Sequence, residues 1–467
     1  MRKKAKGVAW PEAPSRFPKE LTEFLSGDTY SLLIKGGSGS GKTILALTIL
    51  GALKKSENIL YVSTRTSPSQ MMKNYPWTRK VFGVDSENRA DPEAPRGGWE
   101  TLVDARLDEP GIVFERITNV LMDKQAPTVV VDSWESLSDS MDNEALRTNI
   151  KVLQTWRERA GARFIFVGED AANTAIDSVV EGVVVLGEQA FSGRRLREIS
   201  LSKLHGVQIS KPTYFFSLEG GVFHSFDRYR QAELGFTGQT PNANAGAQLG
   251  DQNHASTGFP QLDEELGGGY PLKSMAWIEM DARVDAKVVV AFLAGTIRDW
   301  AASGKSVVLQ KSDEIDSAYV SQLRSSLGGR SADRIMVWGS ASLDKLMDAE
   351  KNREDGLAGL RSKASQENVP VLSVVDWDKI TKSTTPAGPV AIESLIDLLK
   401  RSADLTIVVA RSNLAHQPLS GIVSTHIRIV EINGTVFAMS EKPWSELYAI
   451  VPERKSGNPG IRLERVV

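Results

Sequence analysis

The sequence predicts an α/β protein of two tandem domains, each a mainly parallel sheet with helices on both faces. Short runs of apolar and β-branched residues alternate with helical stretches, which is typical of parallel strands buried on both faces. The plan of the first half returns in the second half, and this favours an internal duplication. At 467 residues, the chain is also too long for a single hydrophobic core.

The elements of the first half follow one another in a simple order. A segment at 17–25 that begins with Phe-Pro leads to a strand at 30–34, a Gly-rich loop and a helix over 43–50. Because parallel strands end at one edge of their sheet, we expect a ligand crevice at that edge. Further strands are expected at 58–63, 128–133, 164–168 and 194–199.

The Gly-rich loop matches the phosphate-loop pattern G-x-x-x-x-G-K-[ST]. Its glycines allow consecutive backbone N–H groups to wrap a polyphosphate, and the following helix adds the positive end of its dipole. Lys42 would reach the β- and γ-phosphates, and the Thr43 hydroxyl would join the Mg²⁺ shell. The sequence therefore predicts a nucleoside triphosphate site. The residues of the loop are Gly36, Gly37, Ser38, Gly39, Ser40, Gly41, Lys42 and Thr43.

Asp132 is the candidate metal-binding carboxylate. It ends an apolar strand 90 residues after Lys42 (132 − 42). Proteins with a phosphate loop place at such a strand end the carboxylate that holds Mg²⁺ through water. The alternative is an ordinary Asp that begins a loop or caps a helix.

The second half repeats the plan without the phosphate chemistry. Strands are expected at 275–278, 306–310 and 371–376, with a helix from Val288. Aligned on Lys287, the two motif glycines become Asp281 and Ala286, and the hydroxyl ligand becomes Val288. Without the glycines the backbone cannot easily wrap an anion, and Asp281 would repel phosphate. Asp376 follows Lys287 by 89 residues (376 − 287), so only the spacing survives.

The predicted domains are residues 1–234 and 256–467. Residues 235–255 are rich in Gly, Gln, Asn, Ala and Thr, a composition that indicates a linker.

Composition narrows the classes of partner and location. The chain is 41% hydrophobic and 24% charged, as in globular proteins, and its net charge of −2 provides no general attraction to nucleic acid or anionic membranes. There are no cysteines, and the five histidines lack metal-ligand spacing. The basic start is not followed by an apolar segment, and no apolar run reaches the length of a membrane span. We therefore expect a cytoplasmic protein without membrane contacts.

Two motifs carry a resemblance to a known superfamily. Residues 256–269, which include Phe259-Pro260-Gln261-Leu262-Asp263, resemble a motif of the KaiC/RadA branch of the RecA superfamily. Lys203-Leu204-His205-Gly206 resembles the Lys-Leu-Arg-Gly element of that branch. Within the branch, residues 15–225 look most like GvpD, a regulator of gas-vesicle genes, through segments 32–36, 60–65, 103–106 and 114–118.

The resemblance implies two tandem RecA-like P-loop domains, the second degenerate, with ATP and Mg²⁺ in the first. It also implies a homo-oligomeric ring or filament with nucleotide at the subunit interfaces, where Lys203 would reach a neighbour's phosphates. KaiC-like domains place two glutamates before Ser-Pro to activate the attacking water, but here Ser67-Pro68 follows Arg65-Thr66. The family's Arg is His205, which is mostly neutral at pH 7.

Glu135 and Glu169 are the candidates to replace the missing base. Both lie near strand ends where the γ-phosphate is expected, and Glu169 holds a position at which RecA-like proteins often sense that phosphate. The alternative for each is a solvated or helix-capping Glu.

These residues predict a regulatory ATPase, slow or conditional, whose nucleotide state controls oligomerisation or the binding of a regulatory protein partner. A DNA-repair or recombination ATPase of the RadA type remains open, although the net charge does not support nucleic-acid binding. A small-molecule kinase and a non-hydrolysing nucleotide-binding scaffold also remain open.

Overall fold

The computed structural model divides the chain into two compact units. The first contains Met1–Asp227 with Val466–Val467, and the second contains Arg228–Arg465. Within the predicted linker, residues 235–252 lie outside the described residues, whereas His254–Ala255 form strand β10. The described residues are 17–53, 58–84, 101–169, 175–229, 253–312, 315, 317–327, 329–338, 369–382, 396–401, 403–412, 417–455 and 458–467.

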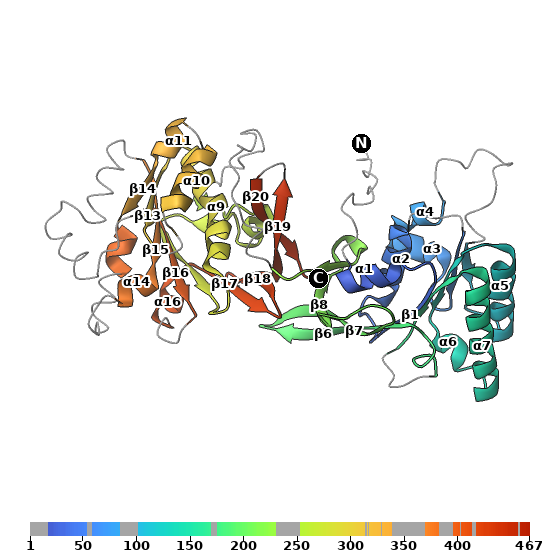
Figure 1. The fold of residues 1–467 in the computed structure, drawn as a ribbon. Helices are drawn as coiled ribbons and strands as arrows, with labels where there is room; N and C mark the ends of the chain where they lie inside the picture. Colours follow the sequence, from blue (N-terminus) through green and yellow to red (C-terminus); the bar gives the residue numbers. More distant parts are fainter. Residues whose placement is uncertain are drawn as a thin grey trace, which may run out of the picture. The chain divides into compact units, whose positions relative to one another are not determined.

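The first unit is built on a nine-stranded sheet of order β3-β2-β4-β5-β1-β6-β7-β8-β9 (Figure 1). Strands β1 to β6 pair in parallel, and β6 to β9 pair in antiparallel fashion. The strands are β1 (Tyr30–Gly36), β2 (Ile59–Ser63), β3 (Leu102–Asp104), β4 (Thr128–Asp132), β5 (Arg163–Val167), β6 (Gly182–Phe191), β7 (Arg194–Leu204), β8 (Thr213–Ser217) and β9 (His224–Phe226). The helices are α1 (Lys19–Leu25), α2 (Lys42–Ala52), α3 (Pro68–Asn74), α4 (Thr78–Val81), α5 (Pro110–Asp123), α6 (Glu135–Ser138), α7 (Asn143–Ala160) and the 3₁₀ turn η2 (Glu219–Gly221).

Both faces of this sheet are buried. Leu32 and Ile34 of β1 belong to one apolar core, together with residues of α1, α2, α3 and α4. Leu33, between them, belongs to a second core with residues of α5, α6 and α7. This alternation follows from the two-residue period of a strand, and it confirms the predicted parallel sheet with helices on both faces.

The second unit repeats the same connectivity. Its sheet has the order β14-β13-β15-β16-β12-β17-β18-β19-β20, in which each strand takes the place of its counterpart in the first sheet. Parallel pairing again extends through β17, followed by antiparallel pairing to β20. The strands are β10 (His254–Ala255), β11 (Tyr270–Pro271), β12 (Ser274–Met280), β13 (Ser306–Gln310), β14 (Ile335–Trp338), β15 (Val371–Asp376), β16 (Leu405–Arg411), β17 (Thr425–Ile432), β18 (Thr435–Lys442), β19 (Tyr448–Lys455) and β20 (Asn458–Arg465).

Helices cover both faces of the second sheet as well. In Figure 1, α9, α10 and α11 lie on one face and α14 and α16 on the other. Met275 and Trp277 of β12 contribute to one core, whereas Ala276 and Ile278 contribute to the other. The helices are α8 (Pro260–Glu265), α9 (Ala286–Ala302), α10 (Ser317–Leu327), α11 (Gly329–Asp333), α14 (Trp377–Lys382) and α16 (Gln417–Ile422).

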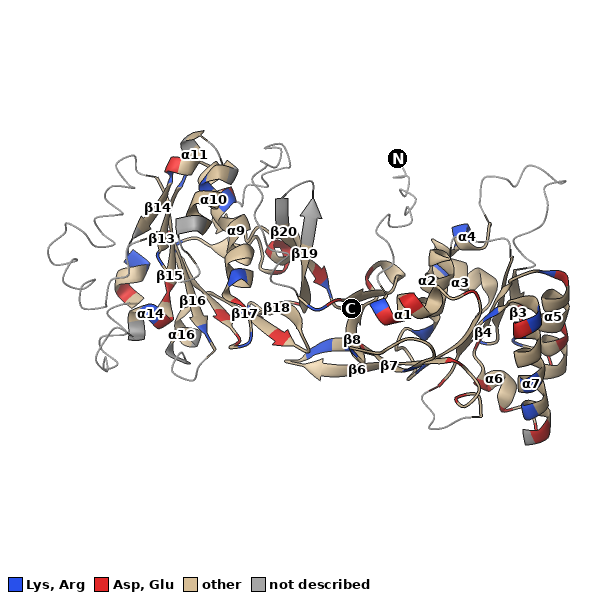
Figure 2. Cartoon of the chain, in the orientation of Figure 1, with Lys and Arg blue, Asp and Glu red and all other residues tan. Residues whose placement is uncertain are grey.

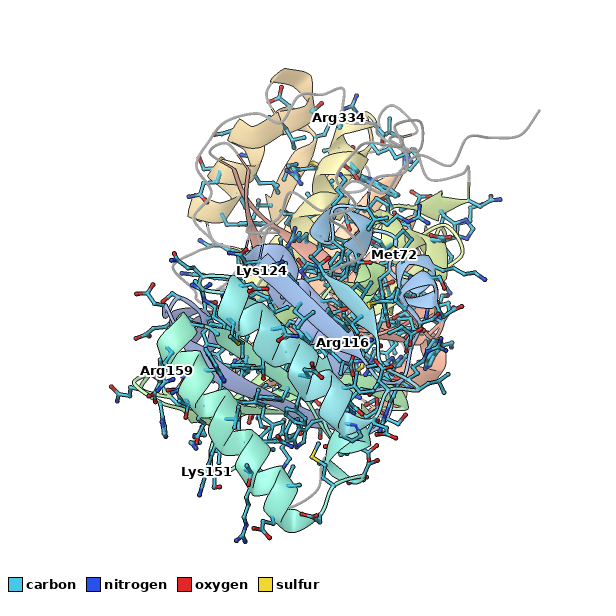
Figure 3. The ribbon with its side chains drawn as sticks, turned by 90° about the vertical axis from the view of Figure 1, so that its right-hand side faces the viewer. Met72, Arg116, Lys124, Lys151, Arg159 and Arg334 are labelled. Atoms are coloured by element: carbon cyan, nitrogen blue, oxygen red, sulfur yellow. The ribbon has the colours of Figure 1, made fainter. Side chains whose placement is uncertain are left out.

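The outer helices of the first unit carry charges of both signs. Figure 2 shows Lys and Arg beside Asp and Glu on α5 and α7. Arg116 on α5 and Lys151 and Arg159 on α7 are exposed in this layer (Figure 3), and Arg116 pairs with Asp108 at 2.9 Å. Among the described residues, no helix is both long enough and apolar enough to cross a membrane.

Candidate nucleotide-binding site

The predicted phosphate loop connects β1 to α2 in the first unit. Gly41 takes a left-handed conformation (φ 101°) at the N-cap of α2. Gly36 has a φ of 154°, and a Cβ added there would lie 2.6 Å from both the Leu186 carbonyl oxygen and Ser40 Oγ. Only glycine fits this close backbone approach, so the loop has the shape of a cradle that side chains would fill.

Lys42 points its amine back over this loop. Its Nζ donates hydrogen bonds to the carbonyl oxygens of Gly36 (2.5 Å) and Gly37 (2.9 Å). Burial lowers the pKa of Lys42, and the negative charge of Glu169 opposes that shift. The amine is therefore held at the loop by carbonyl groups that a bound phosphate could replace as partners.

Thr43 and Asp132 meet at the edge of the sheet. Thr43 Oγ1 donates to Asp132 Oδ2 at 2.7 Å, although the two residues are 89 positions apart. The buried hydroxyl of Tyr61, on neighbouring strand β2, donates to the same oxygen at 2.6 Å. Burial, reinforced by the charge of Asp132, raises the pKa of Tyr61 far above its usual value, so the phenol remains a donor.

The Thr43–Asp132 contact fits a magnesium site. Mg²⁺ in nucleotide sites is usually held by one or two protein oxygens, with phosphate oxygens and water supplying the rest. Within the part of the chain that the structure describes, no group of three His, Cys, Asp or Glu side chains is arranged to hold a metal alone. The geometry therefore suits a metal ion that arrives with a phosphate ligand.

The two candidate bases lie side by side, but each already has a contact. Glu169 Oε1 accepts a hydrogen bond from Arg65 Nη2 at 2.8 Å. The hydrogen bond and charge of Arg65 lower the pKa of Glu169, which makes this carboxylate a weaker base. Glu135 Oε1 accepts the backbone N–H of Glu169 at 2.6 Å, whereas its Oε2 is buried without a hydrogen-bond partner among the described residues.

Lys203 makes its contacts within the first unit. Its Nζ donates to the carbonyl oxygens of Val180 (2.6 Å) and Asp177 (3.4 Å), and His205 nearby is exposed. Lys203 lies within β7, one residue before its end, and these contacts hold its amine against the segment that precedes β6. The role of Lys203 across a subunit interface remains a prediction.

The corresponding connection in the second unit is a capped turn. Asp281 Oδ1 accepts bonds from the backbone N–H and the Nε of Arg283, and Asp285 caps α9 by accepting the N–H of Lys287 at 2.9 Å. Carboxylates occupy the turn where the first unit has glycines, and Lys287 is exposed. Asp376 Oδ1 accepts the N–H of Lys379, as a helix cap does.

A cavity of about 410 Å³ lies at the carboxyl edge of this second sheet. Aliphatic side chains form most of its described wall, including Val289 and Leu293 of α9 and Val374 of β15. The polar part of the wall holds two cations, Lys379 and Arg411, beside two carboxylates, Asp376 and Asp378, so charges of both signs face the cavity.

Sequence reasoning missed two residues that support the loop. Tyr61 orients Asp132 as described above, and its place in the apolar run 58–63 was the available signal, because the hydroxyl of a Tyr buried in such a strand usually has a partner. Arg197 of β7 is 5% exposed, and its Nη1 donates to the Gly39 carbonyl oxygen at 3.1 Å. The sequence shows an arginine-rich strand here, but no local pattern predicts which of its arginines contacts the loop.

The fold and the loop together define the class of protein. A parallel sheet that ends in a glycine cradle, with a hydroxyl on the following helix bonded to the Asp of a neighbouring strand, is the arrangement of P-loop nucleotide-binding proteins.

Comparison with known proteins narrows the class of the first unit. Residues 24–223 match the family model of the KaiC ATPase. Two proteins of Halobacterium salinarum are similar to the chain: GvpD1 is 27% identical over 301 residues, and GvpD2 is 26% identical over 310 residues. These alignments cover 61% and 64% of this chain, and 54% and 62% of the two relatives. The chain thus spans less than two thirds of either relative, and the predicted resemblance to the RecA superfamily and to GvpD is confirmed.

Proposed function

We propose that this protein is an ATP-binding regulatory ATPase whose slow or conditional turnover controls its own assembly or the binding of a regulatory protein. The observation that carries the proposal is the 2.7 Å contact between Thr43 and Asp132, which joins the phosphate loop to a strand-end carboxylate. The KaiC-type domain and the similarity to the GvpD proteins support the regulatory class. The proposal also places the protein in the cytoplasm, where ATP and Mg²⁺ are available.

The residues of the first unit would have separate roles in binding and hydrolysing ATP. Lys42 and the loop amides bind the phosphates, and the hydroxyl of Thr43 with the carboxylate of Asp132 holds Mg²⁺, which would supply charge neutralisation and orientation. Glu135 or Glu169 would orient the attacking water. Lys203 would stabilise charge on the nucleotide of a neighbouring subunit in a ring or filament.

Slow turnover follows from the state of the two carboxylates. Arg65 occupies the position where KaiC-like domains place their glutamates, and its ion pair lowers the pKa of Glu169. Glu135 retains one oxygen without a described partner, but this oxygen is buried, so the side chain would have to move before water could reach it. When the candidate bases have a lowered pKa or are held by other contacts, the rate of hydrolysis falls more than the affinity for nucleotide does.

The experiment is a measurement of mass in solution by light scattering with and without ATP and Mg²⁺, with phosphate release followed in the same sample. We expect ATP to change the mass and phosphate to appear slowly. Lys42→Ala should abolish both effects. If ATP neither binds nor changes the mass, the proposal is wrong.

A non-hydrolysing nucleotide-binding scaffold is the second candidate, and the Arg65–Glu169 pair favours it. That candidate predicts an ATP-dependent mass change with no phosphate release above that of Lys42→Ala. A DNA-repair ATPase of the RadA type predicts turnover that DNA stimulates, with DNA binding that weakens steeply as salt rises. The mixed charges on α5 and α7 (Figure 2) give this third candidate little support.

A further inference from the structure

One ion pair crosses the candidate site at the carboxyl edge of the first sheet. Arg65 lies two residues beyond the end of β2, and Glu169 lies two residues beyond the end of β5. Strand β4 runs between β2 and β5 and ends at Asp132. The 2.8 Å contact between Arg65 Nη2 and Glu169 Oε1 therefore connects the strands on either side of Asp132.

The same edge holds the residues that would bind the terminal phosphates. Strand β1, which leads into the loop, pairs with β5, and Thr43 of α2 contacts Asp132 directly. The charges of Glu169 and Arg65 both act on Lys42, in opposite directions. The pair therefore borders the position where Lys42 and Thr43 would hold a γ-phosphate.

The pair is also able to exchange partners. The side chains of Arg65 and Glu169 are 48% and 56% exposed, and an ion pair in water contributes little to stability. The backbone N–H of Glu169 donates to Glu135 Oε1, so the main chain is held while the carboxylate can turn away. A phosphate, by contrast, suits the planar guanidinium because it accepts two parallel charge-assisted hydrogen bonds.

We propose that Arg65 is a γ-phosphate-binding residue of the same chain, which exchanges Glu169 for the terminal phosphate and so distinguishes ATP from ADP. This inference rests on the proposed function, because it requires that the loop binds ATP. The inference assigns a role to Arg65, which stands where KaiC-like domains have a glutamate. Arg65 would bind the terminal phosphate, whereas the glutamate of those domains activates water. The Glu169 carboxylate released by the exchange becomes available to water only when ATP is present.

The test compares affinities for ATP and ADP, measured by isothermal titration calorimetry with Mg²⁺. Arg65→Ala should weaken ATP binding on the order of 10- to 100-fold, the range for a hydrogen bond to a charged group, while ADP affinity stays within about twofold. Glu169→Gln should strengthen ATP binding, because Arg65 loses its ionic partner and the repulsion of phosphate is removed. Arg65→Lys should retain part of the preference.

Arg106→Ala is the matched control. Arg106 is 46% exposed and pairs with Asp104 at 2.8 Å, at the end of β3 next to β2. Its removal should change neither affinity.

Equal losses for ATP and ADP in Arg65→Ala, or no loss of ATP affinity, would overturn the inference while leaving the proposed function in place. A wild-type protein that binds neither nucleotide would overturn both. If Arg65→Ala does not fold, Arg65→Lys and Glu169→Gln provide the test. A ratio of ATP to ADP affinity equal to that of the wild type in both variants would also overturn the inference.

Discussion

Asp132 shows how much one carboxylate in this protein depends on its neighbours. Two hydroxyls, from Thr43 and Tyr61, donate to the same oxygen and so orient the group toward the phosphate loop. An equivalent arrangement exists away from the site, where the Tyr214 hydroxyl donates to buried Glu20 at 2.6 Å. The two tyrosines allow the effect on the site to be separated from the effect on stability.

Tyr61→Phe should weaken Mg²⁺-dependent nucleotide binding about tenfold, because the residues that orient a metal ligand contribute on this scale. A Mg²⁺ titration of nucleotide binding measures the effect. Tyr214→Phe makes the same chemical change at Glu20 and should leave the titration unchanged. Identical Mg²⁺ dependence in Tyr61→Phe and wild type would show that Tyr61 does not position Asp132.

Tyr214→Phe should instead produce a loss of stability that depends on pH. Burial raises the pKa of Glu20, but the hydrogen bonds from Tyr214 and the Lys211 backbone outweigh burial and leave the pKa below its usual value. Ionised Glu20 therefore stabilises the fold above its unfolded pKa, and this contribution is lost as the pH falls through the folded pKa. We expect a cost of about 1.5–3 kcal/mol at pH 7 that shrinks toward pH 4, measured by urea unfolding. A cost independent of pH would contradict this account.

Helix α2 of the first unit and helix α9 of the second unit, which follow corresponding strands, begin in different ways. In the first unit, glycines with positive φ shape the loop, and no side chain caps the start of α2, as an anion site at a helix N-terminus requires. In the second unit, the carboxylate of Asp285 accepts a hydrogen bond from a backbone N–H at the start of α9. This side chain therefore occupies the position that a bound phosphate would take at the start of a helix. The same element thus begins its helix with a glycine and no side-chain cap in the first unit, and with a capping aspartate in the second.

Gly36→Ala should remove nucleotide binding, because its Cβ would lie 2.6 Å from the Leu186 carbonyl oxygen and would force the loop to shift. Gly37→Ala is the matched control: a Cβ there meets nothing within 4 Å. Calorimetry should show a loss of at least about 100-fold in the first variant and a change within a few-fold in the second, since loop geometry decides the contacts with phosphate. Similar affinities in the two variants would show that the cradle is not the binding element.

At the scale of the whole molecule, the chain contains two sheets of the same strand order and one phosphate-loop motif. Both sheets have the same strand order, yet among the described residues the contact between loop, hydroxyl and carboxylate is found in the first unit alone. The second unit retains a cavity at the matching edge, with a mainly aliphatic wall.

We therefore expect a titration to give about one ATP per chain, since the second loop lacks the backbone freedom to wrap phosphate. Lys42→Ala should reduce the stoichiometry to zero, and Lys287→Ala, the same change at the aligned position, should leave it at one. Two bound nucleotides per chain, or a loss on Lys287→Ala, would show that the second unit is also competent.

The sequence by itself determined the features that depend on local pattern and spacing. The duplicated α/β plan, the loop at residues 36–43 and the strand that ends at Asp132 were all predictable, because strand period, glycine spacing and apolar runs are local signals. The predicted linker extends to residue 255, whereas the structure begins strand β10 at His254.

Only the tertiary structure decided which side chains meet at the sheet edge. Tyr61 and Asp132 are 71 positions apart, and Arg65 and Glu169 are 104 positions apart. Their contacts exist because the sheet places β2, β4 and β5 side by side, an order that no local pattern encodes. The resemblance to KaiC-like domains indicated that Arg65-Thr66 stand where those domains place two glutamates, and the fold showed that Arg65 is paired with Glu169.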